Sequence, residues 1–381
     1  MTTLSKAGAF TLLAVASTTI MVGCVIVPGL AGIAAHLGVA HAAGALVTVP
    51  ALGVIVFGAL AGQVIGRLGS HRALCVGLFA YGLLGVAGAA LHGAVLVFAD
   101  RLLLGGATAL VMAAGTALIS AFYDGAARLG MIAKQGMAIE LGGVIFLFVG
   151  GLLATLGWRW PFGLYLVAWV FLAMVLACVP APARAAAPAT AAPLTLPSAM
   201  KGVYAAALVS MVLFFTGVIL LPARLHDLGL SAAQTGYFLS FVSLVAVGAA
   251  ALMPRVVRRL NESGTLCAAF ALYALAHGLF AWGATLAPLI AGAIAMGAGF
   301  GLSVPLVNGM TVERCAAPVR AQALAYLSVA LFGGQFLSSF MALLPGAAST
   351  PFLAAAGGAL CAAAGSAYAV RRNVDARLGS K

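Results

Sequence analysis

Long apolar runs, each interrupted by charged residues, glycine or proline, constrain this chain more than any other feature. They cover residues 8–29, 43–65, 73–92, 96–118, 136–156, 161–180, 201–222, 232–253, 264–284, 286–307, 322–344 and 351–370. A helix needs about 20 apolar residues to cross a bilayer, and an open strand edge cannot be satisfied in lipid. The runs therefore predict an all-α polytopic membrane protein with twelve transmembrane helices.

The composition excludes a soluble fold. Of the 381 residues, 64% are hydrophobic and 7% are charged, whereas about 25% of an ordinary soluble chain is charged. Twelve spans leave only short loops, so no separate soluble domain is expected. The first run continues past Cys24 to Pro28, which favours an uncleaved first span over a signal peptide.

The basic residues follow the topology of the predicted spans. The net charge is +12, which could indicate nucleic-acid binding. With a cytoplasmic N-terminus, however, most basic residues fall on the cytoplasmic side: Lys6, Arg67, Arg72, Arg128, Lys134, Arg184, Lys201, Arg255, Arg258, Arg259, Arg314, Arg320, Arg371, Arg372, Arg377 and Lys381. Arg159 and Arg224 lie outside, and Arg101 lies within a span. This asymmetry is typical of the positive-inside rule and predicts cytoplasmic termini and no nucleic-acid partner.

The chain divides into two halves that repeat one another. Residues 181–200, rich in proline and alanine, predict a cytoplasmic linker between a six-helix bundle at 1–180 and another at 201–381. Three pairs of segments match between the halves, namely Leu37-Gly38-Val39 with Leu228-Gly229-Leu230, Arg67-Leu68-Gly69-Ser70 with Arg259-Leu260-Asn261-Glu262, and Leu141-Gly142-Gly143 with Phe332-Gly333-Gly334. Internal duplication of this kind is typical of transporters that work by alternating access, and it predicts two pseudo-symmetric bundles.

Several stretches match short patterns of one known protein family. Residues 62–72 (GQVIGRLGSHR) resemble its GxxxDRxGRR loop, with Gly66 in place of the acidic residue. Residues 101–109 (RLLLGGATA) are similar to its RxxxGxxxA segment. Residues 142–151 (GGVIFLFVGG) resemble its antiporter pattern gxxxGPxxGG, although Phe146-Leu147 replaces the central Gly-Pro.

A corner motif extends the match. Residues 157–162 (GWRWPF), with Tyr165, resemble the GWRxPFxxY corner of bacterial drug exporters, and residues 221–236 resemble the same group's entry to its eighth span. The chain is thus similar to major facilitator superfamily transporters, in particular to the proton antiporters that export drugs or metabolites. The resemblance implies a multi-pass protein of the bacterial inner membrane, energised by the proton gradient and without other cofactors.

The resemblance predicts export of a small amphipathic molecule by proton antiport. An uptake symporter or uniporter of a small organic solute stays open, because the antiporter pattern lacks its Gly-Pro. A membrane enzyme or scaffold is disfavoured, since the chain contains no GxxxxGK[ST], HExxH or GxSxG pattern. We therefore expect a monomeric transporter, not an enzyme, with lipid, protons and substrate as its partners.

Charged residues inside spans are costly and need a reason. The resemblance gives Arg101 a role in proton transfer or in holding a polar group, with a structural arginine as the alternative. Glu140 lies in an apolar stretch about one turn from the cytoplasmic end of span five, where a desolvated carboxylate can load and release a proton; pairing with Arg128 or Lys134 is its alternative. Asp100 is a further candidate for the proton path, although adjacent residues point about 100° apart on a helix, so we expect it to point away from Arg101.

The remaining candidates fall into two groups. Candidate substrate contacts in the second half are aromatic or polar residues suited to an amphipathic ligand: Tyr204, Phe214, Phe215, Thr216, Asn308, Gln335, Ser338 and Ser339. Candidate gate residues on the cytoplasmic face are Arg67, Arg72, Asp124 and Arg128. His277, in the middle of span nine, is predicted to be a neutral, packed side chain. No pair of histidines shares metal-ligand spacing, so no metal site is expected.

Overall fold

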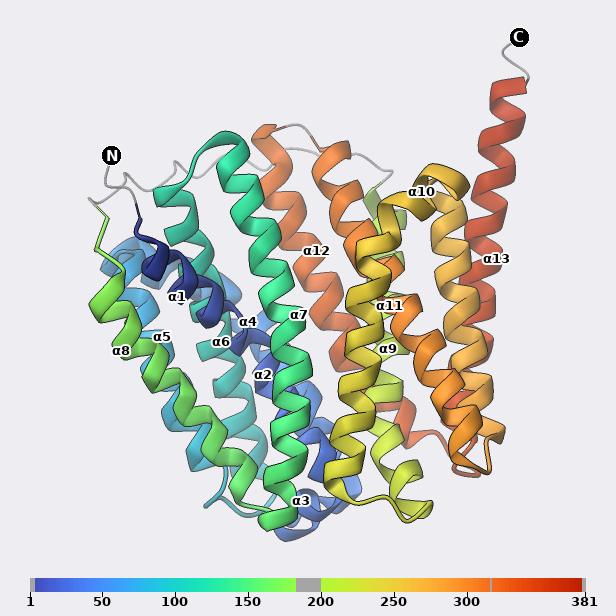
Figure 1. Cartoon of the computed structure of the whole chain (residues 1–381), viewed down its shortest axis with the longest axis horizontal. Coiled ribbons are helices and arrows are strands. Elements are labelled where there is room, and N and C mark those ends of the chain that lie inside the picture. Colours follow the sequence, from blue (N-terminus) through green and yellow to red (C-terminus); the bar gives the residue numbers. More distant parts are fainter. Residues whose placement is uncertain (1–3, 183–199, 316, 379–381) are drawn as a thin grey trace. The chain divides into compact units, whose positions relative to one another are not determined.

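The computed structural model describes residues 4–182, 200–315 and 317–378, and these residues form helices and connecting turns without any strand (Figure 1). Most of the predicted linker, residues 183–199, lies outside the described residues. In the first half the elements are α1 (Lys6–Ala16), α2 (Thr18–Cys24), η1 (Val27–Gly29), α3 (Leu30–His36), η2 (Ala40–Ala42), α4 (Ala45–Leu68), α5 (Ser70–Ala87), α6 (Ala94–Phe122), α7 (Gly125–Leu156), η3 (Trp160–Leu166) and α8 (Val167–Cys178). In the second half they are α9 (Met200–Asp227), α10 (Ala232–Trp282), α11 (Leu286–Arg314), α12 (Ala317–Leu337), η4 (Ser338–Leu343) and α13 (Thr350–Leu378).

The described helices confirm the all-helical membrane fold. They include 11 segments long and apolar enough to cross a membrane. One of these is α10, which has 51 residues; a straight helix of that length would measure about 76 Å at a rise of 1.5 Å per residue, more than twice the apolar thickness of a bilayer. Its helical conformation is interrupted at Asn261 (φ 58°, ψ 178°), so α10 contains two spans. The described chain thus agrees with the twelve spans predicted from the apolar runs.

The first span is not one continuous helix. It passes through α1, α2, η1 and α3 before reaching His36, and together these elements form one candidate span over the predicted apolar run at 8–29. A run of three hydroxyl residues, Ser17, Thr18 and Thr19, stands where α1 ends and α2 begins. Such side chains compete for helix carbonyls and bend helices, which accounts for the interruption.

Contacts within the chain define two compact units. The first contains the described residues up to Pro182 together with Gly229–Ser240, and the second contains residues 200–228 and those from Phe241 onward. The segment Gly229–Ser240, which includes the start of α10, therefore packs with the first unit. In the first unit α4 lies against α6, and in the second α9 lies against α11 and α12.

Two of the matched pairs of segments have the same unusual backbone in both halves. Gly69 has φ 81° and ψ 156°, and its counterpart Asn261 has φ 58° and ψ 178°. Gly38 has φ 75° and its counterpart Gly229 has φ 81°. Because positive φ is rare outside glycine, these pairs indicate that the sequence repeat is also a structural repeat.

Glycine permits the closest helix contacts, as the abundance of small residues predicted. A Cβ added at Gly53 of α4 would meet Leu102 O of α6. In the same way, a Cβ added at Gly105 of α6 would meet Pro50 O of α4. The backbones of α4 and α6 therefore touch without intervening side chains.

Candidate functional site

Arg101 lies at the centre of a buried polar cluster in the first unit. The side chain is 1% exposed, the largest fully buried side chain among the described residues. Its Nη1 donates to the Tyr165 hydroxyl at 3.2 Å, and its Nη2 pairs with Asp100 Oδ2 at 3.0 Å. The guanidinium also lies 5.4 Å from the ring centroid of Phe162. Protein groups therefore pair with the buried guanidinium, and leaving this charge unpaired would be strongly destabilising.

The ion pair corrects the expectation that Asp100 points away from Arg101. The two residues are adjacent on α6, and their Cβ atoms do diverge around the helix axis. The arginine side chain is long enough to fold back, and its Nη2 reaches Asp100 Oδ2. The angular rule therefore fails here because it applies to short side chains.

Two buried tyrosines link this cluster to the broken first span. The Tyr165 hydroxyl, which accepts from Arg101, donates to Val22 O at 2.8 Å. The Tyr81 hydroxyl of α5 donates to Thr18 O at 2.7 Å. The two rings lie 5.8 Å apart at an angle of 58°. Residues from α2, α5, α6 and η3 thus form one connected network.

Gly85 of α5 and Gly88, the residue that follows α5, provide the space for the cluster. A Cβ at Gly85 would run into the Tyr165 ring, and a Cβ at Gly88 would run into the Arg101 guanidinium and the Phe162 ring. This explains the local sequence of α5, in which small residues face the large side chains contributed by α6 and η3.

Glu140 is an acidic residue of a candidate span for which the described residues provide no partner. It is half-buried on α7, and no described residue forms an ion pair or hydrogen bond with its carboxylate. Arg128 and Lys134 are both exposed and do not contact it.

The contacts of α7 show which face carries Glu140. Ser240 Oγ donates to Val144 O at 2.9 Å, one turn beyond Glu140. A Cβ at Gly236 would meet Leu147 O and Gly151 Cα. Residues 140, 144, 147 and 151 share one face of a helix. Glu140 therefore lies on the face of α7 that packs against Gly229–Ser240, one turn before this contact.

The predicted substrate contacts of the second half are all in helices of the second unit. Most of their polar side chains donate hydrogen bonds to backbone carbonyls of the same unit. Phe214 and Phe215 are buried on α9, and the Phe214 ring lies 4.1 Å from that of Phe300. Thr216 and Asn308 donate to carbonyls of their own helices, whereas Ser338 and Ser339 of η4 donate to carbonyls at the end of α12. Tyr204 donates to Ala323 O of α12 at 3.1 Å. Gln335 is buried and also has a partner. Tyr204 and Phe214 thus connect α9 to α12 and α11.

The predicted gate residues are not paired with one another in the described structure. Arg67, Arg72, Asp124 and Arg128 are all exposed. The ion pair found at a loop of this kind lies in the second unit, between Glu262 and Arg314. The sequence repeat indicates this position, because Glu262 belongs to the second copy of the loop that contains Arg67.

His277 is packed, as predicted. It is completely buried, its Nε2 lies 2.9 Å from Leu213 O, and its ring centroid lies 6.0 Å from those of both Phe280 and Phe352. Within the described residues no three histidine, cysteine or acidic side chains are grouped closely enough to hold a metal ion.

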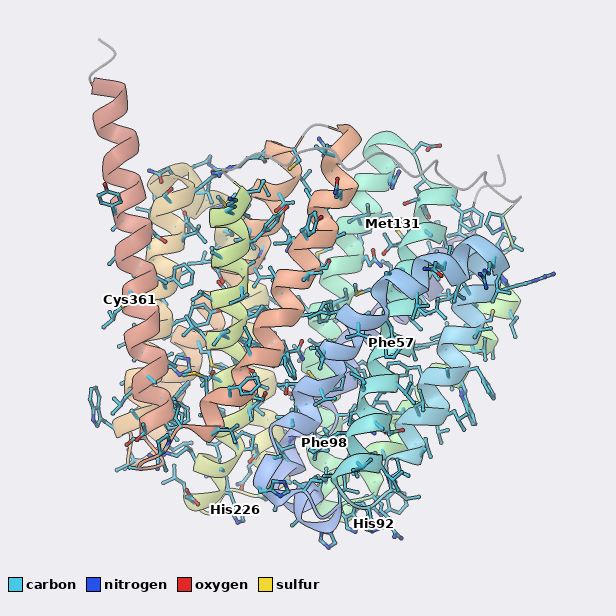
Figure 2. All side chains as sticks on the ribbon, turned by 180° about the vertical axis from the view of Figure 1, so that it is seen from behind. Phe57, His92, Phe98, Met131, His226 and Cys361 are labelled. Atoms are coloured by element: carbon cyan, nitrogen blue, oxygen red, sulfur yellow. The ribbon has the colours of Figure 1, made fainter. Side chains whose placement is uncertain are left out.

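A groove of about 200 Å³ lies between α4 and α6 of the first unit, where Figure 2 labels Phe57. Its lining is apolar throughout: Phe57, Leu60, Ala61, Val64, Leu103, Gly106 and Leu110. It offers no polar side chain that could orient a ligand, so it does not form part of the candidate site.

Comparison with protein families identifies one match, the family described as the Major Facilitator Superfamily, over residues 9–339. No curated protein matches the chain.

Solved structures of transporters share this fold. A mutant of the nucleoside transporter NupG has a TM-score of 0.76 at 14% identity, covering 95% of this chain and 99% of its own. A mutant of the peptide transporter POT has a TM-score of 0.76 at 15% identity, covering 96% and 94%. A D-xylose-proton symporter has a TM-score of 0.73 at 17% identity, covering 94% and 95%. At these identities the likeness establishes the fold alone.

Proposed function

Because the chain belongs to the major facilitator superfamily, we propose that it is a secondary active transporter that exports a small amphipathic molecule in exchange for protons. Transport proceeds by alternating access, with two conformations that open the substrate path to opposite sides of the membrane. The multi-pass membrane fold supports transport, and the unpaired carboxylate of Glu140 is the observation that favours proton coupling.

Glu140 has the properties of a proton carrier. Desolvation in a span disfavours the charged form of a carboxylate. No described cation stabilises the charged form of Glu140. Asp100, in contrast, is already neutralised by Arg101. Glu140 is therefore the carboxylate whose charge can change during a transport cycle.

Proton and substrate are coupled only if they favour different states of the carrier. A protonated Glu140 is neutral and tolerates an apolar environment, whereas the ionised form favours a hydrated or positively charged one. Exchange follows if substrate binding and proton binding at Glu140 exclude one another. The aromatic and hydroxyl side chains of α9, α11, α12 and η4, among them Tyr204, Phe214 and Asn308, supply groups suited to an amphipathic substrate.

An uptake symporter is the second candidate. The antiporter pattern lacks its Gly-Pro, since Phe146-Leu147 occupies that place. A proton symporter for D-xylose is also among the structures with the same fold. In a symporter proton and substrate bind together, so the direction of the proton flux that accompanies substrate movement separates the two mechanisms.

The charge asymmetry of the loops supports the proposed location. Counted over short loops, the excess of lysine and arginine places the basic side in the cytoplasm. We propose a monomer in the bacterial inner membrane with both termini cytoplasmic, in which Arg67, Arg72, Asp124 and Arg128 lie at the cytoplasmic gate.

The test uses purified protein in liposomes that contain a pH-sensitive dye. Cationic dyes, neutral antibiotics and small polar metabolites are added in turn under an imposed pH gradient. Antiport predicts proton movement opposite to that of one substrate class, and its loss in Glu140→Gln. Glu313→Gln serves as the matched control, because Glu313 is exposed near the end of α11, and it should behave as wild type.

Three results would change the proposal. Proton and substrate movement in the same direction would establish symport. Substrate movement that ignores the pH gradient would establish a uniporter. Proton coupling that persists in Glu140→Gln would remove Glu140 from the proton path.

A further inference from the structure

The joint in the first span is built from side-chain hydroxyls. Ser17 Oγ donates to Ala14 O at 2.6 Å, Thr18 Oγ1 to Val15 O at 2.8 Å, and Thr19 Oγ1 to Ala16 O at 2.8 Å. These three consecutive bonds satisfy carbonyls at the end of α1. In a membrane every backbone carbonyl needs such a partner, so the hydroxyls make the interruption between α1 and α2 tolerable.

Beyond the joint, tyrosines from other helices supply the partners. The Ile26 N–H bonds to Gly23 O at 3.3 Å, so Val22 O lacks the donor that a regular α-helix would provide. The Tyr165 hydroxyl takes that place at 2.8 Å. The Tyr81 hydroxyl binds Thr18 O at the start of α2. The two ends of α2 are thus each held by one tyrosine.

Arg101 and Asp100 orient Tyr165. The hydroxyl accepts from Arg101 Nη1 at 3.2 Å, so its proton is directed toward Val22 O. Asp100 Oδ2 pairs with Arg101 Nη2, the other terminal nitrogen of the guanidinium, at 3.0 Å. All three side chains are buried, and hydrogen-bonded chains in such surroundings strengthen one another.

The held segment packs against the helix that carries Glu140. A Cβ at Gly142, two residues after Glu140, would run into Ser17 of the joint, and a Cβ at Gly150 would run into the backbone of Val25. The residues on either side of α2 therefore touch α7 closely, so a shift of α2 would change its packing against α7.

From these contacts we propose that Tyr81 and Tyr165 are positioning residues that hold α2 at its joint and against α7, and that Arg101 and Asp100 act through Tyr165. In this assignment Arg101 does not touch substrate. The positioning role rests on the proposed function in one respect, namely that α7 carries Glu140, the proposed proton carrier.

The experiment uses the full chain with Cys24 as the reporter, because Cys24 is buried in α2. The other five cysteines are replaced by alanine, and a second background retains Cys267 of α10 alone. Alkylation by a membrane-permeant maleimide is timed in Tyr165→Phe, Tyr81→Phe, the double variant and Arg101→Lys. Tyr123→Phe is the matched control, since Tyr123 lies in the same unit and no described residue bonds to its hydroxyl.

We expect Tyr165→Phe to speed alkylation of Cys24 by about fivefold, the factor that corresponds to one lost hydrogen bond. The double variant should exceed either single variant. Arg101→Lys should resemble Tyr165→Phe, because lysine can pair with Asp100 without reaching the tyrosine. Cys267 should react at its wild-type rate throughout. In transport, the maximal rate should fall while KM stays unchanged, since none of these side chains contacts substrate.

Equal alkylation of Cys24 in Tyr165→Phe and Tyr123→Phe would overturn the proposal. So would a matching rise at Cys267, which would indicate general loosening, or a rise in KM, which would place Arg101 or Tyr165 at the substrate. The alkylation readout needs no transport. If the protein shows no proton antiport but Cys24 is alkylated faster in Tyr165→Phe, the proposed function is refuted and the positioning role is still supported.

Discussion

At the scale of single residues, the main result concerns how a charge is accommodated in the membrane. Arg101 pairs with Asp100 and donates to Tyr165, and its guanidinium also lies against aromatic rings. Glu140 has no such partner among the described residues. The two residues are both charged and both lie in spans, yet their surroundings favour different roles, a fixed structural charge and a charge that can change.

The space left by Gly88 gives a prediction at this scale. Replacing Gly88 by alanine places a Cβ against the Arg101 guanidinium and the Phe162 ring. Such overpacking costs about 1–3 kcal/mol, so Gly88→Ala should lower the midpoint of thermal unfolding in detergent. Gly115→Ala is the control, because nothing lies within 4 Å of its Cβ, and it should be neutral or slightly stabilising. Equal midpoints for the two variants would contradict the packing described here.

Residue-level prediction identified the charged side chains in the spans but not their partners. Glu140 and Arg101 stand out in the sequence because charge is rare in apolar runs. The partner Tyr165, however, is 64 residues away from Arg101, and no periodicity predicts a contact at that separation. The pairing with Asp100 was missed because helix geometry alone does not describe the reach of a long side chain.

At the scale of elements, the joints between helices repeat between the halves, but with different residues. Gly69 separates α4 from α5, whereas its counterpart Asn261 lies inside α10 and has a similar backbone conformation. The side chain of Asn261 accepts from the Gly264 N–H at 2.9 Å. Asparagine therefore accepts a strained backbone and also caps the helix that follows it.

This arrangement predicts different effects for two substitutions at Asn261. Asn261→Ala loses the cap and places alanine at a positive φ that asparagine tolerates better, and the two effects together cost about 2–3 kcal/mol. Asn261→Gly loses the cap but relieves the strain, so its cost should be less than about 1 kcal/mol. Thermal unfolding of the full chain measures both. Gly69→Ala should behave like Asn261→Ala, although no atom lies within 4 Å of its Cβ. A more stable Asn261→Ala than Asn261→Gly would refute the strain argument.

The spans themselves were predicted well, because length and hydropathy determine whether a helix can cross a bilayer. The joint at Ser17 was not. Its hydroxyl residues are visible in the sequence, but similar residues occur in unbroken helices, and what distinguishes this site is the pair of tyrosine donors from α5 and η3. The candidate cluster could therefore be predicted only in part.

At the scale of the whole molecule, the distribution of basic residues leads to a prediction of topology. Arg72 and Arg159 are both exposed, and the positive-inside rule places them on opposite sides of the membrane. In a chain without other cysteines, Arg159→Cys should react with an impermeant maleimide in intact cells. Arg72→Cys should react only after permeabilisation. The reverse pattern would invert the orientation proposed here and with it the direction of export.

The division of the chain into compact units also limits how it can be shortened. Residues Gly229–Ser240 pack with the first unit, although they follow α9 of the second. A half-length protein that ends after α8 therefore lacks the Ser240 hydroxyl that binds Val144 O and the Tyr237 ring that stacks on Phe148. It exposes a face of α7 that the intact chain covers. Fragment complementation should therefore work best when the first fragment extends through Ser240. A cut at the linker separates the two sequence repeats, but it also separates Gly229–Ser240 from the unit with which they pack.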